Sequence, residues 1–216
     1  MEGLKSIINK ILQSVSGGVF GLLSITFGLT GDIIAFLLFP GYDFTKRAVS
    51  YLCKGPGGIF FQIGSIISGI FAILFVVSLG RTFEGDRISE KFKKRTIIVA
   101  LISCVSLIIL GAFCGSNPIV ALIHGIFAFI SWLFGLFYIT LFNILILRDS
   151  KFANQLLYFG FIVTISLVLL LIIFILHFFE GIHFLVIILP SLEWIDTFAI
   201  IIWYAIISVY MIHKKI

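Results

Sequence analysis

The chain has 216 residues, of which 61% are hydrophobic and only 12% are charged, and its formal net charge is +5. A soluble domain is about half apolar and about one quarter charged, so this chain has too few charges to cover a water-exposed surface. Lipid must therefore solvate most of its outside. The basic residues lie in loops between apolar runs, where they indicate membrane topology and argue against a nucleic-acid partner.

Six apolar segments are long enough to cross a bilayer, since a spanning helix needs about 20 mostly apolar residues. The predicted spans are 17–39, 58–79, 96–114, 119–147, 156–179 and 192–212. The sequence therefore predicts an all-α fold, in which residues 17–216 form a single integral membrane domain of six transmembrane helices.

A short amphipathic segment, residues 1–16, precedes the first span. Its apolar residues follow helical spacing, while polar residues such as Lys5 and Gln13 occupy the other face. This pattern is typical of a helix lying in the membrane interface. A cleaved signal peptide fits less well, because the apolar run that follows is longer than the apolar core of a signal peptide.

The lysines and arginines predict the orientation. With the N-terminus inside, twelve of the 15 lie on the cytoplasmic side, and only Lys46, Arg47 and Lys54 lie outside. Cytoplasmic loops carry such an excess, so we expect both termini in the cytoplasm, and we expect the plasma membrane of a prokaryote. The basic inner loop over residues 81–95 is a candidate contact for anionic lipid.

Ionisable side chains gather on the predicted outer side. Asp32 lies in the outer half of the first span, His124 in the fourth, and Glu193 and Asp196 at the start of the sixth. A charge inside a span costs about 2–3 kcal/mol on insertion scales, so Asp32 should face the bundle interior. We take His124, Glu193, Asp196 and Asp32 as candidate catalytic residues of an outer-facing pocket.

Each of these residues also has a structural interpretation. Asp32 can bond to Arg47, to a hydroxyl or to backbone. His124 can be hydrogen-bonded packing, although imidazole is also a common general acid or base. Glu193 and Asp196 share one helix face in the predicted first turn, where the helix dipole favours negative charge.

The outer loop carries positive charge against the orientation rule. We take Lys46, Arg47 and Ser50 as candidate contacts for an anionic lipid head group. The alternatives are solvated loop charges, or pairing of these bases with the acidic residues listed above.

The three cysteines do not predict a site. Cys104 and Cys114 lie in an apolar run and are expected to be small core residues, whereas Cys53 lies in the outer loop. Pairing of Cys53 with Cys114 is geometrically possible, but their positions alone do not establish a disulfide. Cysteine and histidine spacings give no metal-ligand pattern, and nucleotide-binding and hydrolase motifs are absent. We expect neither a metal nor a cofactor.

The first span carries a stripe of small residues at intervals of three or four. It consists of Gly17, Gly21, Ser24, Gly28 and Gly31. Such a stripe lets another helix approach closely, so we expect this face to be packed inside the bundle.

Two segments resemble motifs of known families. The stretch AVSYLCKGPG at residues 48–57 resembles an ISxxG-type loop, although Tyr51 stands where an acidic or polar residue often follows the serine. The fourth span contains His124, Ala128, Gly135 and Tyr138, and is similar to an HxxxA…GxxY helix. Both motifs are found in the DRAM/Frag/Sfk group of six-helix eukaryotic membrane proteins, and in a related bacterial and archaeal family known only as a domain of unknown function.

A third motif agrees with this resemblance. Glu193 and Trp194 open the last span and resemble the EW motif of the same group, which includes GPI-anchor lipid-remodelling factors. The resemblance implies a six-helix architecture and a role in lipid handling.

Three functions fit the sequence. The first is lipid binding or lipid modification in an outer-leaflet-facing polar pocket, with membrane lipids as partners. The second is a non-catalytic scaffold or modulator, in which the polar residues hold helices together. The third is a small transporter, which needs a continuous polar path that the apolar inner halves of the spans do not provide.

Overall fold

The computed structural model describes residues 10, 12, 14–85, 87–179 and 187–216. Helices account for the regular structure of these residues, which include no strand. The elements are α2 (Gly17–Leu37), the short 3-10 helix η1 (Val49–Lys54), α3 (Gly58–Thr82), α4 (Glu90–Ala112), α5 (Pro118–Arg148), α6 (Leu156–Phe179) and α7 (Leu189–Lys214). The predicted interfacial helix over residues 1–16 lies largely outside the described residues and stays a prediction.

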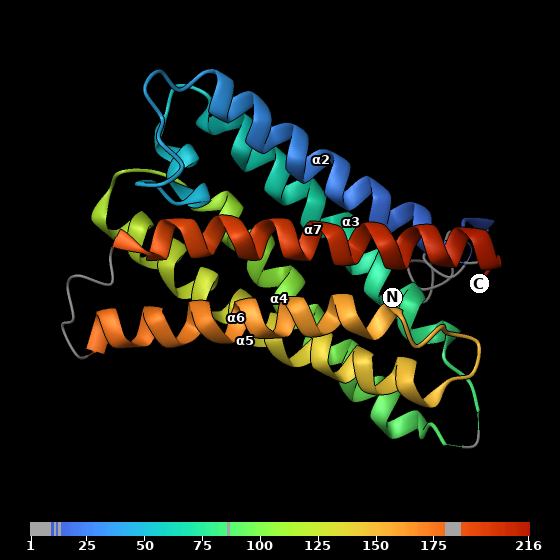
Figure 1. The fold of residues 1–216 in the computed structure, drawn as a ribbon. Helices are drawn as coiled ribbons and strands as arrows, with labels where there is room; N and C mark the ends of the chain where they lie inside the picture. Colours follow the sequence, from blue (N-terminus) through green and yellow to red (C-terminus); the bar gives the residue numbers. More distant parts are fainter. Residues whose placement is uncertain (1–9, 11, 13, 86, 180–186) are drawn as a thin grey trace.

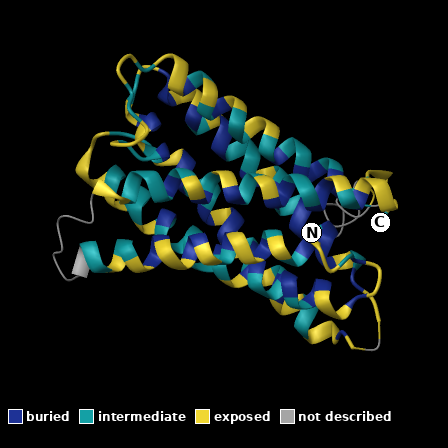
Figure 2. Ribbon diagram, viewed as in Figure 1, coloured by how far each residue is buried: buried dark blue, intermediate teal, exposed yellow. Residues whose placement is uncertain are grey.

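Six of the helices are long and apolar enough to cross a membrane, one for each predicted span. The all-helical fold with six candidate membrane-spanning helices is therefore confirmed, and the chain is an integral membrane protein. Figure 2 shows exposed positions along the outer sides of the helices. Large apolar residues such as Ile59, Leu122 and Ile162 are among them, as expected where lipid replaces water.

Two helices begin earlier than the sequence predicts. α4 begins at Glu90 instead of residue 96, because the Ser89 hydroxyl caps it by accepting a hydrogen bond of 3.2 Å from the Phe92 N–H. Its first turns are too basic to count as an apolar span. α7 begins at Leu189 instead of residue 192, and Pro190 occupies its first turn, a position that proline tolerates because an N–H there has no partner within the helix.

The six helices form a closed ring. Each helix packs against the next one along the chain, and α7 packs against both α6 and α2. Figure 1 shows η1 and the α4–α5 connection at one end of the bundle, and the start of α2 and the end of α7 at the other. We call these the η1 end and the terminal end.

Aromatic side chains fill the middle of the ring. Phe75, Tyr138, Phe142, Trp203 and Tyr204, which we call the aromatic plug, are each 5% exposed or less. Phe75 packs against Trp203 and Tyr204 with ring centroids 6.2 and 4.7 Å apart, and Tyr138 packs against Trp203 at 6.2 Å. α3, α5 and α7 are thereby held together across the ring axis.

The backbones of α2 and α3 approach each other closely where the two helices cross. A Cβ atom added to Gly64 would lie 2.9 Å from both the Gly31 Cα and the Phe27 carbonyl oxygen. A Cβ on Gly31 would lie 2.6 Å from the Phe60 carbonyl oxygen. The small-residue stripe of the first span therefore faces the interior, and backbone atoms leave no room for a side chain at this crossing.

We expect Gly64→Ala to lower the free energy of unfolding by about 1–3 kcal/mol, because the added methyl group meets backbone that cannot move aside locally. Thermal unfolding in detergent measures this effect. Gly125→Ala is the matched control, since a Cβ there meets no atom within 4 Å. Equal melting temperatures for the two variants would contradict the close crossing.

Candidate functional site

A cavity of about 200 Å³ lies in the half of the ring nearest the η1 end. We call it the polar cavity. It is lined by residues of α2, η1, α3, α4, α5 and α7. Five residues singled out from the sequence line it together: Asp32, Ser50, His124, Glu193 and Asp196.

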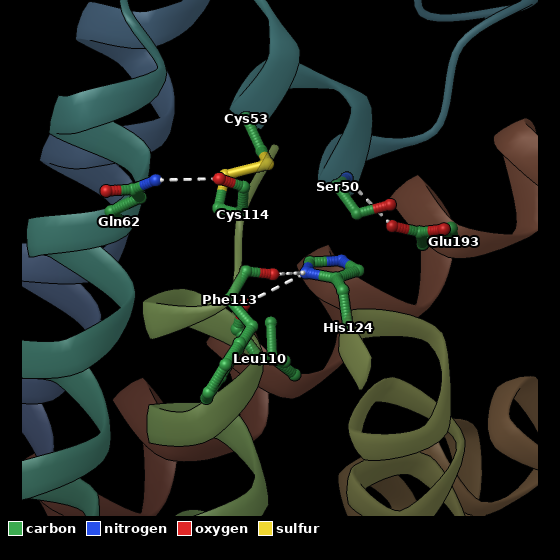
Figure 3. Close-up of a disulfide and its surroundings, with 8 residues drawn as sticks. All are labelled: Ser50, Cys53, Gln62, Leu110, Phe113, Cys114, His124 and Glu193. Atoms are coloured by element: carbon green, nitrogen blue, oxygen red, sulfur yellow. Dashed lines mark hydrogen bonds between the residues drawn. A yellow bond between two sulfur atoms is a disulfide. The ribbon is translucent and has the colours of Figure 1, made fainter. Parts of the chain in front are cut away.

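Glu193 joins α7 to η1. Its side chain is 6% exposed, and one carboxylate oxygen accepts a hydrogen bond of 2.9 Å from the Ser50 N–H (Figure 3). The first N–H groups of a helical turn lack partners within the turn, so Glu193 satisfies one of these groups in η1. Because α7 begins at Leu189, Glu193 and Asp196 lie beyond its first turn. The proposed interaction with the dipole of that turn is therefore wrong.

Asp196 joins α7 to α6. It is 2% exposed, and its Oδ1 accepts a hydrogen bond of 2.7 Å from the Ser166 hydroxyl. Ser166 was not identified from the sequence. It is one of the few hydroxyl residues in the very apolar α6. The rarity of hydroxyl residues in this helix is the sequence feature that could have identified Ser166.

Asp32 lines the polar cavity from α2. Within the described residues it forms neither a hydrogen bond nor an ion pair with another side chain or with backbone. The pairing with Arg47 considered from the sequence is not formed. The carboxylate of Asp32 is thus available to a group inside the cavity.

His124 is held by one ring nitrogen. Its Nδ1 lies 2.9 Å from the Leu110 carbonyl oxygen and 3.0 Å from that of Phe113, as Figure 3 shows. Carbonyl oxygens only accept, so Nδ1 must carry a hydrogen. These carbonyls belong to the end of α4, where no helical N–H follows. In the neutral ring the buried Nε2 is then an acceptor, and it has no partner.

A disulfide links η1 to the α4–α5 connection. Cys53 and Cys114 are bonded, with their Cα atoms 5.6 Å apart, and the Gln62 side-chain amide donates to the Cys114 carbonyl oxygen at 3.1 Å. Figure 3 shows the disulfide near Ser50 and His124. Cys114 is therefore not a free core thiol as expected, whereas Cys104 is free and buried.

The two basic residues considered for head-group binding do not line the polar cavity. The Arg47 guanidinium stacks on the rings of Phe39 and Tyr51, 5.1 and 5.2 Å from their centroids. The Lys46 ammonium lies 3.3 Å from Asp43, and its side chain is 80% exposed. The structure thus brings Ser50 to the cavity and leaves these two bases in the loop.

Tyr42 and Trp194 fix the backbone of this loop. The Tyr42 hydroxyl donates to the carbonyl oxygens of Arg47 and Ala48 at 3.0 and 2.6 Å, and the Trp194 indole N–H donates to the Arg47 carbonyl oxygen at 3.1 Å. Burial raises the pKa of Tyr42 to about 12, so its phenol remains a donor at neutral pH. These bonds position Ser50 over α7.

Serine hydroxyls supply most of the remaining polar lining. Ser24 donates to the Ser68 carbonyl oxygen at 3.0 Å, and Ser103 donates to the Ser131 carbonyl oxygen at 2.9 Å. Ser65, Ser68, Ser103 and Trp132 also line the cavity, although they were not identified from the sequence. The signal for the first two was their spacing, since residues three apart share a helix face.

The cavity is rich in hydrogen-bond acceptors. Three carboxylates and the His124 Nε2 surround it, and its described lining contains no lysine or arginine. Among the residues that the structure describes, no three His, Cys, Asp or Glu side chains are placed to hold a metal ion. The arrangement can bind a donor group, and Nε2 can exchange a proton with a bound molecule.

We expect His124→Leu to lower the free energy of unfolding by about 1–3 kcal/mol, because the two carbonyl oxygens at the end of α4 lose their donor. His124→Asn should lose less, since its amide can still donate near the position of Nδ1. Chemical unfolding in detergent compares the two variants. An asparagine variant as unstable as the leucine variant would show that this bond contributes little.

The chain matches one protein family over most of its length. Residues 22–210 match the family described as protein of unknown function (DUF998). No curated protein and no solved structure matches the chain. The six membrane-spanning helices and the lining of the polar cavity all fall largely within the matched residues. The chain belongs to DUF998, a protein family of unknown function.

Proposed function

We propose that this DUF998 protein handles lipids, and that its polar cavity receives the head group of a lipid from the outer leaflet. The observation that carries the proposal is the convergence of Asp32, Ser50, His124, Glu193 and Asp196 on one cavity of about 200 Å³. Helices solvated by lipid enclose this cavity. A membrane lipid is therefore the ligand that we propose.

Two independent features support an outer location for the η1 end. Of the 14 lysines and arginines that the structure describes, 11 lie toward the terminal end, and Lys46, Arg47 and Lys54 lie toward the η1 end, which agrees with the positive-inside rule. The disulfide of Cys53 and Cys114 also lies at the η1 end, and disulfides persist in oxidising compartments. We propose that both termini are cytoplasmic, in the plasma membrane of a prokaryote.

The same geometry supports a chemical role beyond binding. The Nε2 of His124 faces no protein partner, and the carboxylates of Glu193 and Asp196 line the same cavity. A base held in this way can take a proton from water that attacks an ester or phosphoester, and the protonated imidazole can return that proton to the alcohol oxygen released when the ester bond breaks. In this proposal His124 is the base, and the three carboxylates, including Asp32, orient the bound group.

The residues that resemble a DRAM/Frag/Sfk motif lie at the proposed lipid site. We infer a relationship to the DRAM/Frag/Sfk group, because His124, Ala128, Gly135 and Tyr138, which carry the motif, all line the cavity.

We also propose that the basic loop over residues 81–95 contacts anionic lipid. Lys91, Lys94 and Arg95 are exposed in the first turns of α4. Each basic residue near an anionic membrane surface contributes about 1 kcal/mol of attraction.

The orientation predicts opposite labelling of two cysteine variants. Lys46→Cys should react with a membrane-impermeant maleimide in intact cells, and Lys91→Cys only after the cells are opened. The unsubstituted chain is the control, because Cys104 is buried and the other two cysteines are bonded. The reverse pattern would place the η1 end in the cytoplasm.

Filling the cavity tests the site. We expect Ala128→Phe, which adds a ring at a lining residue that is 7% exposed, to lower the amount of bound lipid several-fold. Native mass spectrometry of the purified protein measures that lipid. Ile126→Phe adds a ring on the lipid-facing side of the same helix, at a residue that is 47% exposed, and should change nothing.

One result would favour the scaffold over the lipid-handling function. If Ala128→Phe folds normally, judged by its melting temperature, and retains the same lipid as Ile126→Phe, the head group does not occupy the cavity. The polar residues would then serve only to hold the helices together, as in a scaffold.

A further inference from the structure

The charges around the polar cavity are all of one sign. Asp32, Glu193 and Asp196 line it, and its described lining includes neither lysine nor arginine. Arg47, the basic residue closest in sequence to Ser50, stacks on aromatic rings in the loop. An anionic group inside the cavity would therefore lie near carboxylates without a compensating positive charge, and like charges repel each other.

Several acceptors in the cavity have no donor. Asp196 is 2% exposed, and its Oδ1 is bonded to Ser166, whereas its Oδ2 has no hydrogen-bond partner among the described residues. The Ser65 hydroxyl also lines the cavity without a partner in the described part of the chain, at 7% exposure. The His124 Nε2 is a third such atom. The Asp196 oxygen and the His124 Nε2 only accept, whereas the Ser65 hydroxyl can accept or donate. Buried acceptors left without donors are costly, so the first two atoms point to a ligand that donates.

We propose that the cavity binds a primary ammonium group. Such a group carries one positive charge and three N–H donors, which match the carboxylates and the unpartnered acceptors. Its hydrogen bonds to Glu193 and Asp196 would be charge-assisted and therefore strong. A quaternary ammonium group has no N–H donor and would leave these acceptors unsatisfied, although aromatic rings also attract it.

The size of the cavity limits the ligand. Sites for drug-sized molecules have volumes of about 300–1,000 Å³, whereas this cavity measures about 200 Å³. An aminoethyl group is small enough for a cavity of this volume and carries the primary ammonium group. In a lipid, that group is the ethanolamine head, and its phosphate would remain toward the loop that carries Arg47. A free small amine presents the same chemistry without the phosphate.

The lipid version of this proposal rests on the proposed function, whereas the amine chemistry does not. One experiment offers the full chain, purified in detergent, equal amounts of ethanolamine, choline and glycerol phospholipids, and measures bound lipid by native mass spectrometry. We expect about ten-fold enrichment of the ethanolamine lipid, as charge-assisted hydrogen bonds imply. Preference for the glycerol or choline lipid, lost in Ala128→Phe, would overturn the ammonium proposal and leave lipid binding intact.

Two variants test the carboxylates separately. Glu193→Gln and Asp196→Asn keep the size of the side chain and remove its charge, and each should reduce the ethanolamine preference about ten-fold. Ile126→Phe is the control, because residue 126 is 47% exposed on the lipid-facing side of α5 and does not line the cavity. An unchanged preference in both cavity variants, with melting temperatures equal to that of the control, would overturn the proposal.

Free ethanolamine distinguishes the two sources of the group. Calorimetric titration of the protein with ethanolamine and with choline measures binding without a lipid tail. Binding of ethanolamine that Asp196→Asn abolishes, together with no lipid bound in a cavity-dependent way, would support the ammonium site and overturn the lipid function. Absence of both ethanolamine binding and cavity-dependent lipid binding would overturn both proposals.

Discussion

Polar groups inside a lipid-solvated ring must find partners within the protein, and this constraint organises the half of the bundle near the η1 end. Lipid tails offer neither donors nor acceptors, and several interior carboxylates and hydroxyls bond to a neighbouring element of the bundle. Glu193 bonds to η1 and Asp196 to α6. The paired serines connect α2 with α3 and α4 with α5. The helix order around the ring is thus reinforced by bonds that have no substitute in the membrane.

The interior divides into two unlike halves along its axis. Toward the η1 end, acceptors surround a cavity, whereas below it the aromatic plug closes the axis with rings that are almost fully buried. Tyr138 and Tyr204 belong to both, since they line the cavity, and their hydroxyls lie 3.3 Å apart. The buried rings beside the cavity suit binding better than passage along the axis.

The sequence predicts the spans well because lipid imposes length and apolarity directly on each helix. It also identifies Asp32, His124, Glu193 and Asp196, since ionisable residues in apolar spans are costly and must face the interior. Partners such as Ser166 and the Leu110 carbonyl oxygen were not predictable, because they depend on how the helices rotate against one another. Lys46 and Arg47 lie in a loop, where no periodicity indicates the direction of a side chain.

The disulfide has a consequence for how the chain is assembled during synthesis. Cys53 and Cys114 both precede α5, so their bond can close before the last three helices have been made. Once closed, the disulfide holds η1 beside the end of α4. The Ser50 N–H is then already positioned when α7, which carries its acceptor Glu193, is made. The final helix can therefore be recognised by a surface that the first half of the protein has already completed, which gives insertion a defined last step.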